Sequence, residues 1–387
     1  MSAHNPLKRV NILGSLTMCG VGMLYAAYQT ISDSIFSHYQ QPFSIIGVYI
    51  ALFFSGNIVS LLVSGEISDR RGKKCVSLWG FKLIIISALL IAYAPHKILL
   101  YMGLFLYGGS HGIIEGTVTS ALVDENPSFE TGISNITQAF FSLGGIISPV
   151  ICVMYLNHGG SFAHIFVFFS IIFFVLWLLL SHTKFGTLPP KKEIKKSPNL
   201  LYILRDRHYM LMVVIMVIYV GVEAGYCFYE KQYFIASVNS EQLGATGLSV
   251  FWAAMVISRL LLGMRPGKET SVLTIFSAGM FVSLLLLLIV PNAYLKLVFS
   301  GLFGFFCGPI WPTIFTLCTK QQSQFSGTAS SFIVLSGSLG GMLFAPALGL
   351  ISREPENILW MMLTLPAAMI LLSYLNKQLR QGEEQAA

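Results

Sequence analysis

Charged residues are scarce in this chain. Aspartate, glutamate, lysine and arginine make up 11 % of its 387 residues, whereas 55 % are hydrophobic, and the mean hydropathy is +0.71. A soluble domain usually carries about 25 % charged residues, so this chain has too few to cover a surface that faces water. The composition excludes a soluble globular protein and indicates that lipid is its main solvent.

Paired cysteines and common catalytic signatures are also lacking. The six cysteines fall in or beside expected membrane spans without a CxxC or CxxH pair, so we expect no disulfide, no metal and no cofactor. The segment from Gly108 to Gly112 matches the G-x-S-x-G pattern of serine hydrolases, but that chemistry needs a strand-turn-helix elbow and this pentapeptide lies inside an apolar span. We therefore expect a protein that is not an enzyme.

Alternating strand patterns are not evident, which disfavours an outer-membrane barrel. Apolar stretches of roughly 20 residues recur instead, the length that a helix needs to cross about 30 Å of hydrocarbon. Charge clusters and Pro/Gly turns divide the chain into twelve such segments. We therefore predict an all-α membrane protein with twelve transmembrane helices. The expected helices lie near 11–36, 43–65, 75–94, 98–123, 132–156, 162–182, 209–236, 243–264, 270–291, 295–319, 326–350 and 355–376.

The only long polar connector is the segment 184–208, which carries paired prolines and a basic run. We interpret it as a solvated linker whose charge would also bind anionic headgroups. The predicted organisation is an N-terminal six-helix half at 1–183, a cytoplasmic linker at 184–208 and a C-terminal six-helix half at 209–387.

Lysine and arginine are distributed unevenly between the two sides. With the N-terminus inside, most of them fall in cytoplasmic segments, whereas the opposite loops hold only Lys97, Lys296 and Arg353. The positive-inside rule then places both termini in the cytoplasm, in a multi-pass protein of the bacterial inner membrane. The first span has no small-residue cleavage site, so we keep it in the mature protein. The net charge of +7 reflects topology, and no nucleic-acid partner is expected.

Ionisable side chains inside the spans are the first functional signal. A charge at the bilayer centre costs about 2.5–3.5 kcal/mol, so such groups usually face a cavity. Polar residues share one helical face in three spans. They are Tyr25, Gln29 and Asp33 in the first span, His111, Glu115 and Thr119 in the fourth, and Tyr219, Glu223, Tyr226, Glu230 and Tyr233 in the seventh.

The second signal is the loop G-E-I-S-D-R-R-G-K-K at 65–74, between the second and third spans. It resembles the G-x-x-x-D-R-x-G-[RK]-[RK] signature of the major facilitator superfamily. Its glycines permit a tight turn and close helix approach, and its Asp and Arg suit an ion pair that latches the cytoplasmic side. The resemblance implies gating roles for Gly65, Asp69, Arg70, Gly72 and Lys73, with Asp124 as a further partner for the arginines.

Members of that superfamily line their cavity with the first, fourth, seventh and tenth spans. The polar faces lie on three of these, and the tenth contributes Trp311 and Pro312. The resemblance therefore implies substrate contacts from Tyr25, Gln29, Glu223, Tyr226 and Trp311. Glu230 and Lys231 either act in transport or reach water at the span end. For His111 a functional and a packing role stay open, and Arg259 either pairs with an acid or lies near the cytoplasmic interface.

Within the superfamily the chain is similar to the fucose permease group of proton-coupled sugar symporters. The similarity rests on S-D-S-I at 32–35, G-I-I-E at 112–115, N-I-T-Q at 135–138, P-T-I-F-T-L at 312–317 and S-S-F-I-V at 330–334. It implies that Asp33 and Glu115 are proton-coupling carboxylates and that Asn135 and Gln138 line the cavity. Thr30 and Gly116 stand where the group often has asparagine, which leaves the sugar open.

The expected function is secondary active transport of a small polar solute, a sugar by this resemblance, through alternating access coupled to protons. Burial favours the neutral form of a carboxylic acid, which suits Asp33 or Glu115 to carry the proton. We expect a monomer whose partners are the solute, the proton and the bilayer. A proton-coupled exporter of drugs or amphipathic compounds and a non-transporting membrane sensor are the alternatives, and the direction of transport stays open.

Fusion proteins test the predicted topology. Alkaline phosphatase fused after Ala387 is expected to be inactive, because its disulfides form only outside the cytoplasm, whereas green fluorescent protein at that position fluoresces. A phosphatase fusion after His158, in a loop expected outside, is the matched control and is expected to be active. An active phosphatase at Ala387 would require an odd number of crossings and contradict the prediction.

Overall fold

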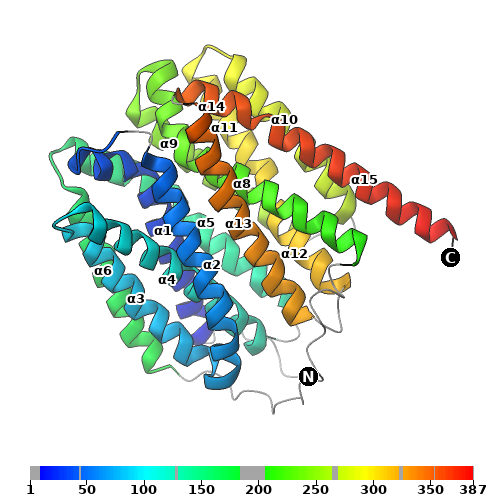
Figure 1. Cartoon of the computed structure of the whole chain (residues 1–387), viewed down its shortest axis with the longest axis horizontal. Coiled ribbons are helices and arrows are strands. Elements are labelled where there is room, and N and C mark those ends of the chain that lie inside the picture. Colours follow the sequence, from blue (N-terminus) through cyan, green and yellow to red (C-terminus); the bar gives the residue numbers. More distant parts are fainter. Residues whose placement is uncertain are drawn as a thin grey trace.

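The computed structural model describes residues 9–42, 45–126, 130–183, 205–263, 269–321, 326–352 and 354–386 and shows a helical bundle (Figure 1). Twelve of its helical segments are long and apolar enough to cross a membrane. The six of the first half are α1 (Arg9–His38), α2 (Ile46–Arg71), α3 (Lys73–Tyr93), α4 (Lys97–Glu125), α5 (Glu130–Asn157) and α6 (Phe162–Ser181).

The second half contains six further spans built from eight helices. They are α8 (Arg207–Val238), α9 (Glu241–Gly263), α10 (Glu269–Ile289), α11 (Ala293–Cys307), α12 (Ile310–Gln321), α13 (Ser326–Ile351), α14 (Pro355–Met362) and α15 (Thr364–Ala386). The helices and their order confirm the predicted all-α, twelve-span fold. The boundaries differ by about three residues or fewer, except that α2 ends at Arg71 instead of 65 and α15 at Ala386 instead of 376. The end of α15 extends beyond the rest of the bundle (Figure 1).

Two expected spans are broken. The tenth was expected to be one helix at 295–319, but α11 ends at Cys307 and α12 begins at Ile310. Pro309 and Pro312 have no backbone N–H, so the carbonyl groups four residues before them lose their helical donors. The twelfth span breaks in the same way between α14 and α15, three residues before Pro366. The proline positions account for both breaks.

The two halves repeat one design. In each half the first span packs on the fifth (α1 on α5, α8 on α13) and the second on the fourth (α2 on α4, α9 on α11). The sequence repeats as well: G-V-x-x-x-Y-x-x-Y at 20–28 in α1 recurs at 221–229 in α8, and S-L-G-G at 142–145 in α5 recurs at 338–341 in α13. The halves are therefore pseudo-repeats.

Glycines bring the paired helices into backbone contact. A Cβ on Gly22 of α1 would overlap the carbonyl oxygen of Phe141 in α5, and a Cβ on Gly340 of α13 would overlap that of Val217 in α8. Such close approach supplies the packing contacts that hold membrane helices together where lipid is as apolar as the side chains. The small residues thus set the distance between helices within each half.

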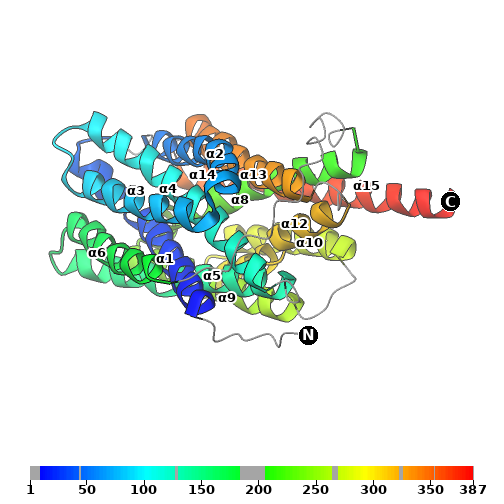
Figure 2. The same cartoon turned by 90° about the horizontal axis from the view of Figure 1, so that it is seen from below.

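The halves meet along two interfaces on opposite faces of the bundle, α2 against α13 and α5 against α9 (Figure 2). The repeated S-L-G-G segment lies at both. Gly341 of α13 faces the ring of Phe54 in α2, and Gly145 of α5 faces the indole of Trp252 in α9. The two interfaces are therefore related by the same pseudo-repeat as the halves.

Apolar side chains also cover the outside of the bundle. Leu62, Trp79, Tyr294, Leu350 and Ile351 each expose more than 60 % of their surface. A monomer in water would not present so much apolar surface. The exposed belt fits hydrocarbon, as expected for a multi-pass membrane protein.

Alanine substitution tests the packing at Gly22. Gly22→Ala is expected to destabilise the protein by about 1–3 kcal/mol, because the added carbon forces α1 away from α5. Gly116→Ala is the matched control, since only Leu61 lies near the added carbon, at 3.6 Å, and alanine is the better helix former. Unfolding in detergent, followed by circular dichroism, measures both. Equal stabilities of the two variants would contradict the packing role of Gly22.

Candidate functional site

Glu115 lies at the centre of a polar network between the halves. Gln138 Nε2 of α5 donates to Glu115 Oε1 at 3.4 Å, and His111 Nδ1, one turn earlier in α4, lies 3.6 Å from Glu115 Oε2. The side chain of Glu115 is 26 % exposed. The carboxylate of Glu115 is therefore held from one side and accessible from the other.

The network continues from His111 into the second half. Asn57 Nδ2 of α2 lies 3.3 Å from His111 Nδ1, and Ser338 Oγ of α13 donates to Asn57 Oδ1 at 2.9 Å. Since the amide nitrogen of Asn57 only donates, His111 Nδ1 accepts, which places the proton of a neutral imidazole on Nε2. Hydrogen bonds thus link α13 through α2 to His111 of α4, whose Nδ1 lies beside the Glu115 carboxylate without donating to it.

Arg259 of α9 joins the halves on the other face. Its Nη1 donates to Ser142 Oγ at 2.5 Å and to the Gln138 carbonyl at 3.2 Å, both in α5. Its Nε donates to the Gly308 carbonyl at 2.9 Å. That carbonyl is free because the residue four positions on, Pro312, has no N–H. Arginine therefore supplies the hydrogen bond that the broken span lacks.

The guanidinium of Arg259 also acts on two carboxylates. Its charge lies within electrostatic range of Glu115 from the first half and Glu223 from the second, and these two acids lie within range of each other. Its Nη2 makes no hydrogen bond with the part of the chain that the structure describes. Two acids, one cation and the amide of Gln138 thus meet where the halves face each other.

Asp33 belongs to a second charged cluster, nearer the end of the bundle where α1 ends and α9 begins. Asp33 Oδ2 lies 2.9 Å from Lys231 Nζ of α8, and Lys231 Nζ lies 2.7 Å from Glu241 Oε1 of α9. Gln232 Nε2 also donates to Asp33 Oδ2, at 3.3 Å. Lys231 is 2 % exposed. The alternative prediction that it reaches water at the end of its span is therefore wrong.

The predicted substrate residues do not all lie together. Tyr25 is half-buried, with its ring centroid 5.3 Å from that of His111, and it lies within electrostatic range of Glu115 and Glu223. Gln29 is 2 % exposed, and neither polar atom of its side chain has a partner among the described residues. Trp311, also half-buried, stacks on Phe315 at 5.2 Å. The side chain of Asn135 lies outside the described part of the structure.

Tyr226 lies inside the second half. It is fully buried, its ring packs on Phe303 at a centroid distance of 4.5 Å, and its hydroxyl donates to Glu230 Oε1 at 3.0 Å. Ser300 Oγ donates to the same oxygen at 2.7 Å. In this state Tyr226 and Glu230 form a buried pair and do not join the network at Glu115, although the sequence predicted that the polar faces of both spans line one cavity.

The loop after α2 is anchored by its lysines. Gly72 adopts a φ of 87°, a backbone conformation that favours glycine, and ends α2. Lys73 Nζ lies 2.5 Å from Asp124 Oδ2 of α4, so a lysine is the partner of Asp124 that the structure shows. Gly65, Asp69 and Arg70 belong to α2, but their side chains lie outside the described part of the structure.

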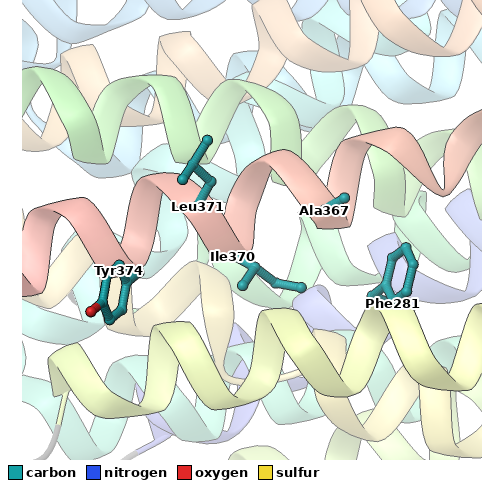
Figure 3. A pocket seen from close by; sticks show the side chains of 5 residues that line it. All are labelled: Phe281, Ala367, Ile370, Leu371 and Tyr374. Carbon is teal, nitrogen blue, oxygen red and sulfur yellow. The ribbon is translucent and has the colours of Figure 1, made fainter.

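An apolar groove on the outer surface is not a candidate for the solute site. It lies between α10 and α15, away from the first half, and is lined by Phe281, Ala367, Ile370, Leu371 and Tyr374 (Figure 3). The Tyr374 hydroxyl is its one polar side-chain group. A polar solute would find no set of hydrogen-bonding partners there.

Sequence reasoning left Lys231 and Arg259 unassigned and missed Asn57 and Ser338. The signal for the first two was present, since a basic residue inside a span needs a partner. Asn57 and Ser338 carried no comparable signal, because a single amide or hydroxyl in an apolar span is common. Only the packing of α2 on α13 brings them together.

Comparison with known proteins places this geometry in a family. The family model of the Major Facilitator Superfamily matches residues 9–345. Among similar sequences, a TsgA homolog of Buchnera aphidicola is 25 % identical over 80 % of each chain. The glucose/mannose transporter GlcP of Bacillus subtilis is 20 % identical over 95 % of this chain and 94 % of its own. The L-fucose-proton symporter of Escherichia coli is 23 % identical over 90 % and 89 %.

The fold agrees with a solved structure. A crystal structure of the E. coli fucose:proton symporter FucP superposes with a TM-score of 0.68 at 20 % identity, covering 94 % of this chain and 98 % of that one. The family match extends through α1 to the last turns of α13, which includes both clusters described above. The chain therefore belongs to the major facilitator superfamily and is a multi-pass membrane transporter.

Proposed function

We propose that this protein is a proton-coupled symporter of a sugar or a closely similar polyhydroxylated solute. The observation that carries the proposal is the pair of intramembrane acids, Asp33 and Glu115. Asp33 is hydrogen-bonded to Lys231 across the halves, and Glu115 is hydrogen-bonded to Gln138 within the first half. Relatives named as a sugar transporter and a sugar:proton symporter match most of the chain. The site and the relatives thus support the same class of cargo.

The groups around Glu115 suit a neutral solute rich in hydroxyls. Glu115 and Glu223 accept hydrogen bonds, Gln138 both accepts and donates them, and Arg259 Nη2 has N–H groups free to donate. The half-buried ring of Tyr25 offers an aromatic face for the apolar side of a sugar ring. A sugar would bridge the halves here, and its removal would leave the two acids and Arg259 to interact directly.

The positions of the contacts support alternating access. At the end that holds Asp33, Lys231 ties α1 to α8, whereas α2 and α13 diverge toward the opposite end (Figure 1). By the charge distribution the Asp33 end faces the outside and both termini face the cytoplasm. The described state is then closed to the outside, and transport requires the halves to rock about the Glu115 network.

Counterflow in proteoliposomes tests the cargo and the coupling. Wild-type protein is expected to exchange a member of a panel of hexoses, pentoses and sugar acids and to accumulate it when a proton gradient is imposed. One proton moving through 100 mV supplies about 2.3 kcal/mol, or roughly 50-fold accumulation. Asp33→Asn is expected to keep exchange and lose accumulation, because the variant cannot carry the proton.

Glu115→Gln is expected to lose proton-driven accumulation as well, and Glu354→Gln, which alters an exposed acid at the start of α14, serves as the control that keeps it. Accumulation by both Asp33→Asn and Glu115→Gln would refute the coupling assignment. Absence of counterflow with every sugar, together with proton flux stimulated by amphipathic compounds, would favour the exporter instead.

Arg259→Lys tests the cation of the solute site. Lysine keeps the charge, but its single ammonium group cannot replace the three nitrogens of the guanidinium, which bind α5, bind the Gly308 carbonyl and leave Nη2 free for the solute. Counterflow is therefore expected to fall tenfold or more. Lys82→Arg, at a lysine that lies over the ring of Trp177 within the first half, is the matched control and should transport normally. Wild-type counterflow by Arg259→Lys, in protein of unchanged thermal stability, would remove Arg259 from the site.

A further inference from the structure

Lys231 connects the halves through two hydrogen bonds and two ion pairs. Its ammonium group donates to the Thr30 carbonyl at 2.9 Å and to Asp33 Oδ2 at 2.9 Å, both in α1, and lies 2.7 Å from Glu241 Oε1 in α9. Two of its three N–H bonds are thus directed at α1, and its charge pairs with the Glu241 carboxylate. Two acceptors belong to the first half and one belongs to the second.

Lys231 and Asp33 are affected differently when the halves separate. Lys231 and Glu241 lie in the same half, so Lys231 keeps a carboxylate partner after separation, whereas Asp33 loses its cation. Asp33 then keeps the Ser34 N–H as a hydrogen-bond donor but has no cation, and burial disfavours a carboxylate without a cation relative to its neutral acid. Separation at this end is therefore easy only when Asp33 carries a proton.

We propose that Lys231 is the positioning residue that makes opening at the Asp33 end depend on protonation of Asp33, with Glu241 as the partner that retains Lys231 in the open state. The proposal rests on the proposed function, which gives Asp33 the transported proton. A proton from the water outside adds to Asp33, its hydrogen bond from Lys231 breaks, and Lys231 stays paired with Glu241. Proton binding and opening thus become one event.

The neighbours of the cluster are consistent with this assignment. From α5 the thiol of Cys152 lies within electrostatic range of Lys231. Glu230, the next acid of α8, directs its carboxyl group at Tyr226 and Ser300. Among the described residues that pack around the cluster, Asp33 is thus the only acid contributed by the first half, and the only one whose pairing is lost on separation.

Distance measurements by electron spin resonance test the proposal without a substrate. Spin labels replace the exposed residues Ser37, at the end of α1, and Ala236, at the end of α8, in full-length protein whose native cysteines are substituted. Wild-type protein is expected to move from a short to a long distance as pH falls from 8 to 5. Asp33→Asn and Lys231→Met are both expected to show the long distance throughout, since neither can form the pair.

Glu241→Gln is expected to shift in the opposite direction. Lys231 then depends on Asp33 alone, so opening should require more acid, by about one pH unit or more. A merely structural role of the cluster would loosen this end in every variant. Lys82→Met, which removes a lysine outside the interface, is the matched control for Lys231→Met, and Lys231→Arg is expected to restore the wild-type response to pH.

Two results would overturn the proposal: a wild-type pH response in Lys231→Met, or a Glu241→Gln shift in the same direction as Asp33→Asn. If Lys231→Met does not fold, the opposite shifts of Asp33→Asn and Glu241→Gln still decide, because both variants keep the lysine. The proposed function fails separately. If no sugar shows counterflow but the spin-label distances change as expected, the proposed cargo is wrong and the role of Lys231 stands. If sugar accumulates with the proton gradient but the distance does not depend on pH, the role of Lys231 is wrong and the proposed cargo stands.

Discussion

Every polar group inside a bilayer must find its partner within the protein, because hydrocarbon offers none. The helices of this chain satisfy almost all backbone groups internally, so the places where a helix is interrupted demand an external donor. The break between α11 and α12 is the informative case. It exposes the Cys307 and Gly308 carbonyls, and the side chains of Tyr219 and Arg259 donate to them.

The same constraint explains where the charges lie. Arg259 and Lys231 are both nearly inaccessible to solvent, and each contacts polar groups of both halves. A contact of this kind is strong while it lasts and has to be replaced when the halves move. In the proposed mechanism Lys231 keeps Glu241 as its partner, and a bound solute would separate Arg259 from two acids. The charged residues are thus located where the halves must part.

Packing within each half follows a different rule. Gly22, Gly108, Gly304 and Gly340 let backbones touch, and the contacts recur in both halves with the same helix pairs. Such surfaces are rigid, because no side chain can adjust between them. The interfaces between halves instead pair an aromatic ring with a glycine, as Phe54 does with Gly341. Halves that pack internally through backbone contacts and meet each other through side chains are suited to moving as bodies.

Much of this architecture could be read from the chain. Apolar length and charge clusters predict the twelve spans, because a helix in lipid must be long enough and free of unpaired charge, and the same reasoning singled out Asp33, Glu115 and Glu223. Helical periodicity predicted less reliably which neighbours a side chain packs against. It grouped Tyr226 with Glu223, but the ring of Tyr226 packs on Phe251 and Phe303 inside the second half, since periodicity defines a face and not the neighbour that covers it.

The sequence by itself determined that the chain lives in lipid, how often it crosses and which acids need an explanation, because these follow from local composition along one helix at a time. Only the tertiary structure decided the partners: Lys231 between Asp33 and Glu241, Arg259 on the broken span, and Asn57 with Ser338. Those contacts join residues that are more than 40 positions apart, except the one between Lys231 and Glu241. They depend on how the two repeats pack, a property that no single segment encodes.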